Sequence, residues 1–336
     1  MGQLGLSISS RGGFAPLAFA DYARRAEAAG LTAVFATENA SDAMALAGMM
    51  GGATTRIAVG TAVTNLYLRH PALAAMTAAT LDEACGGRFV LGLGTVNPRF
   101  NFETLGLPQE PPLTRTREYV EVVRAVLSGQ PVTYSGEVFR LNDFTPYRPP
   151  PRADLPIYLA ALLPGMLRLA GEVADGVLLN LMSARQVRVA VERVQASAEA
   201  AGRDPADVAV ACVLPCYVSD SLPAARQAAR QLVAGYALHP SAARLFAGSG
   251  DAPQMAAVQE RLLAGDRDGA LASVGEHLAT GLVVHGPPDS CLEQVAAFRA
   301  AGVDLPVLFP IALDGDWGQS LSAAVDAFRD PVYADA

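Results

Sequence analysis

Residues 26–36, AEAAGLTAVFA, place an alanine-rich helix end, a glycine and a short apolar strand in direct succession. The same order returns at 198–214, AEAAGRDPADVAVACVL, and at 298–311, FRAAGVDLPVLFPI. Glycine at each join suits the left-handed residue that ends a helix, where a side chain costs energy. Each join is therefore predicted to be a turn from a helix into a strand.

Apolar runs without alternation predict eight strands, because a parallel sheet buried on both faces needs apolar residues throughout. These strands span 3–8, 32–37, 56–63, 88–93, 156–160, 175–180, 207–218 and 305–311. Helical periodicity predicts helices at 15–29, 42–52, 71–84, 115–127, 164–172, 184–201, 221–236 and 319–329, with further ones at 252–264 and 287–301. The alternation of strand and helix predicts an α/β fold, a (β/α)8 TIM barrel with insertions, and a doubly wound sheet is the alternative.

The length of 336 residues fits one domain, 1–336, since such barrels use about 250 residues and accept insertions. Two stretches exceed the minimal repeat, at about 128–154 and 237–282. The first has proline-rich ends around a predicted small hairpin. Insertions of this kind extend the loops that form the rim of the active site.

Composition excludes several classes of protein. The net charge is −8 and the chain has no lysine and no basic stripe, so no nucleic-acid partner is expected. Cys85, Cys212, Cys216 and Cys291 are scattered, which predicts buried thiols and neither a disulfide framework nor a metal site. No basic leader and no long apolar run is present, so we expect a cytoplasmic protein without a membrane partner.

The most polar strand end follows the second strand, in the run Thr37-Glu38-Asn39-Ala40-Ser41-Asp42. Barrel enzymes carry their chemistry at the carboxyl ends of strands, so Glu38 and Asn39 are expected to face the mouth and touch a cofactor or substrate. Asn39 or Ser41 can instead cap the next helix, and both interpretations can hold. Likewise His70, directly before Pro71, is predicted to start a helix rather than bind a metal.

Two familiar motifs are absent. The fourth strand ends in GLGT, 92–95, but no third glycine follows at the spacing of a dinucleotide-binding fold. No GxSxG elbow exists, so a serine hydrolase has no visible nucleophile. Small residues at the end of this strand favour the close approach of something flat.

Three segments carry a family resemblance: RIAVGTAVTNLYLRHPALAAMTAATLDEACGGRFVLGLGT (56–95), PIYLAALLPGMLRLAGEVADGVLLN (156–180) and HGPPDSCLEQVAAFRAAGVDLPVLFP (285–310). They resemble the bacterial luciferase-like superfamily, and within it the branch that uses the deazaflavin coenzyme F420 and is related to methylenetetrahydromethanopterin reductase. The resemblance implies a luciferase-like TIM barrel with F420 as the cofactor and FMN as the alternative.

The resemblance also implies roles for particular residues. In relatives the third strand carries a non-prolyl cis peptide against the back of the deazaflavin ring, and the matching bond here is Ala62–Val63. Thr64 and Asn65 would then lie along the cofactor. The cofactor phosphate would meet a helix start in the loop formed by Ala160, Ala161, Leu162, Leu163, Pro164, Gly165 and Met166.

The chain departs from its relatives at three places. Leu163 stands where relatives usually have glycine before the proline, which puts the affinity for the phosphate in doubt. Glu38-Asn39 stands where some deazaflavin dehydrogenases have an acid–histidine pair. Asn97 stands where the relatives that oxidise glucose 6-phosphate have a glutamate, so a sugar-phosphate dehydrogenase is disfavoured.

The leading hypothesis is an F420-dependent oxidoreductase that moves a hydride between the deazaflavin and a small organic substrate. Glu38 is the first candidate for proton transfer, because partial shielding raises the pKa of a carboxylate, although it can instead only hydrogen-bond the ring. The rival hypotheses are an FMN-dependent monooxygenase and an inactive barrel that acts as a binding partner. By analogy with the superfamily, a homodimer is expected.

Overall fold

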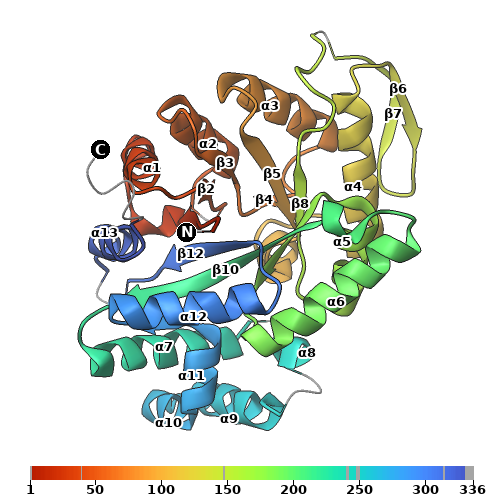
Figure 1. The fold of residues 1–336 in the computed structure, drawn as a ribbon. Helices are drawn as coiled ribbons and strands as arrows, with labels where there is room; N and C mark the ends of the chain where they lie inside the picture. The colour runs from red at the N-terminus through yellow and green to blue at the C-terminus, as the bar shows by residue number, and fades with distance from the viewer. Residues whose placement is uncertain are drawn as a thin grey trace.

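Eight parallel strands close into a barrel in the computed structural model, which describes residues 2–38, 40–146, 148–239, 242–246, 250–312 and 315–329 (Figure 1). In order around the barrel they are β1 (Gly5–Ile8), β2 (Ala33–Ala36), β3 (Ala58–Thr61), β5 (Phe89–Gly94), β8 (Ile157–Ala160), β9 (Gly176–Asn180), β10 (Ala209–Val218) and β12 (Leu305–Pro310). Pairing of β10 with both β9 and β12, and of β12 with β1, completes the ring. The predicted TIM barrel is confirmed, and the doubly wound alternative is excluded.

Two short parallel strands escaped the sequence pattern. β4 (Thr64–Asn65) pairs with the end of β5, and β11 (Val284–Gly286) pairs with the end of β10. Segments of two or three residues carry no measurable periodicity, so they cannot be distinguished from loops in the sequence. Both lie at the carboxyl end of the barrel.

Helices surround the strands, and every predicted helix is present with ends within three residues of the predicted ones (Figure 1). They are α1 (Ala18–Ala28), α2 (Ala43–Gly52), α3 (Pro71–Ala84), α4 (Pro112–Leu127), α5 (Pro164–Val173), α6 (Ala184–Ala200), α7 (Leu222–Ala237), α9 (Ala252–Leu263), α12 (Pro288–Ala300) and α13 (Trp317–Ala327). No helix among the described residues is long and apolar enough to cross a membrane.

Both insertions have secondary structure of their own. The first forms the predicted hairpin, in which β6 (Val132–Ser135) and β7 (Arg140–Phe144) pair in antiparallel fashion. The second contains α9 and three shorter helices, α8 (Ala242–Phe246), α10 (Arg267–Ser273) and α11 (Glu276–Leu282). These helices share a small core with α7, which in Figure 1 lies beside them.

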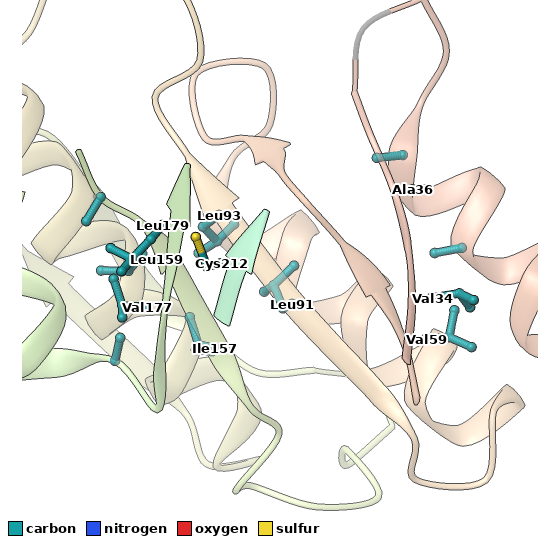
Figure 2. Packing of buried hydrophobic residues seen from close by; sticks show 14 of the residues in the cluster. Val34, Ala36, Val59, Leu91, Leu93, Ile157, Leu159, Val177, Leu179 and Cys212 are labelled. Atoms are coloured by element: carbon teal, nitrogen blue, oxygen red, sulfur yellow. The ribbon is translucent and has the colours of Figure 1, made fainter. Parts of the chain in front are cut away.

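Side chains alternate between two cores along each barrel strand. Outward residues such as Val34, Leu91 and Ile157 pack against the helices, and Figure 2 shows this layer. Inward residues such as Phe35 and Leu178 fill the barrel, so its centre is packed and not a channel. Chemistry is therefore confined to the carboxyl end of the strands, where polar residues replace this filling.

Candidate functional site

The floor of the candidate site is formed by the segment that follows β3. The peptide bond between Ala62 and Val63 is cis, at the position that the family resemblance predicts. The chain then continues as β4 beside β5. A Cβ added to Gly94 of β5 would lie 2.6 Å from Cγ2 of Val63 and 3.2 Å from Cβ of Ala160, so these small residues pack against one another. Together they form a compact apolar surface at the mouth of the barrel.

Glu38 lies at the edge of this surface, one residue beyond Thr37 at the end of β2. Its Oε2 accepts a hydrogen bond from the backbone N–H of Asn65, and the N–H of Ala43 also stabilises the carboxylate. Burial nevertheless raises the pKa of Glu38 above its usual value, and the neighbouring Asp42 carboxylate acts in the same direction. The predicted raised pKa is thus present, whereas Asn39, the second predicted catalytic residue, lies outside the described residues.

The cap of α2 differs from the prediction. Asp42 begins this helix, and its Oδ1 accepts the N–H groups of Met44 and Ala45 at 3.0 and 3.2 Å. The prediction that Ser41 caps the helix was wrong, because an Asp one residue later reaches the same amides and also forms an ion pair with Arg69. Ser41 is exposed.

His70 has the capping role predicted for it. Its Nδ1 accepts the N–H of Ala72 at 3.2 Å, at the start of α3. No cluster of three potential metal ligands occurs among the described residues. The four cysteines are buried and free.

Three buried hydroxyls have no hydrogen-bond partner among the described residues: one is that of Tyr119 on α4, and the other two lie on barrel strands near the mouth. These two belong to Thr64, which has no exposed surface, and to Ser7 on β1, which is 1% exposed. A buried hydroxyl without a partner costs about 1–3 kcal/mol, so such groups indicate a missing polar partner. Thr64 was predicted to lie along a cofactor. Ser7 was not predicted, because a single serine in an apolar strand gives no signal in the sequence.

Asn65 was predicted to lie along a cofactor, but its side chain forms hydrogen bonds within the protein. Its side chain is 1% exposed; Nδ2 donates to Oδ1 of Asn101 at 2.7 Å, and Oδ1 accepts the N–H of Tyr67 at 3.1 Å. The side chain is therefore occupied within the protein, while its backbone N–H holds Glu38. Sequence analysis missed Asn101, which lies in the helical turn Arg99–Thr104 without a recognisable motif.

The loop from Ala160 to Met166 leads into the start of α5. Leu163 is the residue before the helix and provides no capping hydrogen bond, and Pro164 has no N–H. The amides of Met166 and Leu167 both donate to the carbonyl of Leu163 at 3.0 Å. Of the first amides of this helix, that of Gly165 has no partner among the described residues, and with the positive end of the helix dipole it suits an anion.

A second helix start adjoins this loop. A Cβ added to Gly165 would lie 3.0 Å from Cδ1 of Leu113 in the first turn of α4, which also begins without a side-chain cap. Two uncapped helix starts close together reinforce the positive potential. The residues present thus fit a phosphate, even with Leu163 in place of glycine.

The second insertion meets the rim of the barrel at a small apolar cavity of about 10 Å³. Its lining comes from the loops after β8 and β9 and from α7, α8 and α11, namely Leu162, Leu181, Tyr236, His239, Leu245, Phe246 and Leu282. Burial lowers the pKa of His239, which keeps this ring neutral near pH 7. The insertion therefore contributes to the rim, as its position in the sequence predicted.

Comparison with known proteins finds a matching family and similar proteins. Residues 4–305 match the family described as luciferase-like monooxygenase. A 5,10-methylenetetrahydromethanopterin reductase of Methanolobus tindarius is 34% identical over 291 residues, which cover 85% of this chain and 88% of that protein.

Two further likenesses differ in extent. An F420-dependent glucose-6-phosphate dehydrogenase of Microbacterium testaceum is 34% identical over 177 residues, 48% of this chain and 52% of that protein. The solved structure of the F420-dependent tetrahydromethanopterin reductase of Methanopyrus kandleri superposes with a TM-score of 0.82 at 26% identity, and the match covers 97% of this chain and 98% of that one.

Proposed function

This chain belongs to the luciferase-like monooxygenase family, and on that premise we propose that it is an F420-dependent oxidoreductase acting on a small organic substrate. The solved Methanopyrus kandleri reductase and the Microbacterium testaceum dehydrogenase described above are both F420-dependent according to their names. When bound, the deazaflavin supplies hydride transfer at its C5 position. The protein supplies binding, orientation and the movement of protons.

The observation that carries the proposal is the unpartnered Thr64 hydroxyl beside the Glu38–Asn65 hydrogen bond. A heterocycle with polar edges, placed over Ala62 and Val63, gives that hydroxyl the partner it lacks. The uncapped start of α5 then receives the phosphate through the N–H of Gly165 and the helix dipole. Both features fit one elongated ligand with a flat ring and an anionic arm.

Glu38 is the proposed proton-transfer group. Burial raises the pKa of this carboxylate, so a fraction of it stays protonated at a pH closer to neutral. Its Oε atoms can then donate a proton and take it back. The hydrogen bonds from Asn65 and Ala43 hold the carboxylate in one orientation. The alternative role, a hydrogen bond to the cofactor ring without proton transfer, predicts no dependence of the rate on the protonation of Glu38.

Binding of F420, followed by the fluorescence of the coenzyme, tests the proposal. We expect saturable binding of F420 by the purified protein and no retained FMN. Tight FMN together with no F420 binding would establish the rival, an FMN-dependent monooxygenase. Oxygen consumption separates the two independently, because reduced flavins react readily with oxygen and deazaflavins react poorly. Absence of affinity for either cofactor would favour the inactive barrel as a binding partner.

The substrate is proposed to be other than a sugar phosphate. Asn97 stands where glutamate occurs in the glucose-6-phosphate-oxidising relatives, and its Oδ1 accepts the N–H of Arg99 at 2.9 Å. A neutral side chain used to shape its own loop cannot act as their carboxylate does. Turnover of glucose 6-phosphate with F420 would contradict this proposal.

We further propose that the protein is a homodimer that pairs through α2 and α3. α2 has no charged residue, and α3 has charges only in its last turn. Met49 on α2 and Leu73 and Met76 on α3 are exposed to 37%, 46% and 39%. A second copy of this chain would cover these apolar side chains, as isologous dimers do.

A further inference from the structure

A turn of π-helix, Arg99–Thr104, follows β5 and contains the buried residue Asn101. Asn101 has no exposed surface and uses both ends of its amide: Oδ1 accepts Nδ2 of Asn65 at 2.7 Å, and Nδ2 donates to the carbonyl of Thr95 at 2.8 Å. One side chain thus joins β4 to the end of β5. π-Helical turns are rare and frequently occur at functional sites.

A second hydrogen bond connects Asn65, the partner of Asn101, to Glu38 at the mouth of the barrel. Asn65, whose side chain Asn101 holds, donates its backbone N–H to Oε2 of Glu38. The direction of this N–H depends on the orientation of the peptide unit of Asn65. Asn101 is held at Thr95 and in turn holds the side chain of Asn65, which limits rotation of the Asn65 peptide unit. Asn101 therefore acts on Glu38 through Asn65.

Other contacts hold the backbone on both sides of Asn65, through the pairing of β4 with β5 and through the residues that follow. Phe102 packs edge-on against Tyr67 with ring centroids 5.3 Å apart. The guanidinium of Arg115 lies 4.5 Å from the centre of the Tyr67 ring and donates to the carbonyl of Leu66 at 3.2 Å. They hold Leu66 and Tyr67 in place, whereas Asn101 alone among the described residues bonds Nδ2 of Asn65.

We propose that Asn101 is a positioning residue for Glu38: through Asn65 it aims the one N–H group of β4 that holds the carboxylate at the mouth. The inference deepens the proposed function and rests on the role of Glu38 in it. Without Asn101 the Asn65 amide loosens, the carboxylate loses a donor, and proton transfer proceeds from a less defined geometry. Binding of the coenzyme itself is preserved.

The charged and titratable groups that face Glu38 come from three elements. Asp42 at the start of α2 raises its pKa, and Arg69, before α3, lowers it. Tyr119 of α4 also faces it, and its own pKa is raised by burial. None of the three bonds to Asn101, so replacing Asn101 leaves them in place and changes one donor only.

The test compares Asn101→Ala with Arg99→Gln, a matched control in the same π-helical turn. Arg99 pairs with Glu103, and both side chains are largely exposed, at 76% and 69%. Titration of the Glu38 carboxyl group is followed by infrared difference spectroscopy on the cofactor-free protein, with Glu38→Gln identifying its band. We expect the pKa of Glu38 to rise further in Asn101→Ala, because a donor to the charged form is lost, and to stay unchanged in Arg99→Gln.

In the loaded enzyme, Asn101→Ala should lower kcat about tenfold with little change in KM, consistent with the loss of one hydrogen bond to a charged group. Asn65→Ala should have the same effect, and the double variant should add nothing to it, because both act through one contact. A titration of Glu38 unchanged in folded Asn101→Ala would overturn the inference. If that variant does not fold, Asn101→Ser replaces it under the same criterion. Failure of F420 to bind would refute the proposed function while leaving the apo-protein titration to decide this inference.

Discussion

At the scale of single residues, Glu38 is the side chain on which the chemistry depends. Its carboxylate is held by two backbone donors, yet burial keeps its pKa above the usual value. Glu38→Gln retains the size and one acceptor but cannot transfer a proton. We expect kcat to fall about 100-fold, while the affinity for the coenzyme changes little.

The pH dependence provides a separate check. In the direction of substrate reduction, kcat of the unchanged protein should decrease as pH rises through the raised pKa of Glu38, and Glu38→Gln should lack this decrease. The free energy of unfolding should also depend on Glu38. Because the pKa of Glu38 is raised in the folded protein, this free energy falls as pH rises from about 4.5 through that pKa. Denaturant unfolding at several pH values should therefore show that the stability of Glu38→Gln increases relative to that of the unchanged protein as pH rises. Parallel curves for the two proteins would contradict the assignment.

At the scale of elements, a single carboxylate fastens the hairpin β6–β7 to α4. Glu118 accepts the N–H groups of Glu137, Val138 and Phe139 at 2.7–2.9 Å. Burial alone would raise the pKa of Glu118, but these three hydrogen bonds outweigh it and lower the pKa. The stabilisation is fully present above about pH 4.5 and is lost as pH falls through the lowered pKa.

Glu118→Gln should therefore lower the free energy of unfolding by about 1–3 kcal/mol near pH 7, since a neutral amide cannot replace a charged acceptor of three N–H groups. Glu121→Gln is the control: it lies on the same helix and accepts the Tyr134 hydroxyl at 2.6 Å, but it is exposed. Chemical denaturation measures both. Equal effects of the two substitutions would show that the buried contact has no special importance.

Leu163 gives an element-scale prediction at the start of α5. Glycine is a better residue before a helix than leucine and leaves the backbone donors open to an anion. Leu163→Gly should bind F420 about threefold to tenfold more tightly, with no change for the phosphate-free deazaflavin chromophore, which serves as the control ligand. A gain for both ligands would show that the effect does not involve the phosphate.

At this scale the sequence predicted the repeating elements well but missed the shortest strands. Apolar strands and alanine-rich helices repeat their pattern over enough residues to be recognised, as at β10 and α3. β4 and β11 are too short for that. In the site, Glu38 and the Ala62–Val63 bond were found through position and resemblance, but Asn101 depends on a three-dimensional contact with Asn65, 36 positions away in the sequence.

At the scale of the whole molecule, the proposed dimer rests on the apolar face of α2 and α3. Met76→Arg places a charge in the centre of this face and should convert the dimer to monomers in sedimentation. Val189→Arg is the control, because Val189 is exposed to 52% on α6, away from the proposed interface. A dimer that survives Met76→Arg but not Val189→Arg would move the interface to α6.

The thiols of β10 offer a way to observe the barrel as a whole. Cys212 and Cys216 are exposed to at most 1%, and burial raises the pKa of Cys212 to about 12, so no reactive thiolate is accessible in the closed state. A thiol reagent can modify them only after the neighbouring elements separate from β10. Where closing is slower than modification, the labelling rate measures how often the native barrel opens, without any engineered probe. A bound ligand that bridges several strand ends should slow that rate.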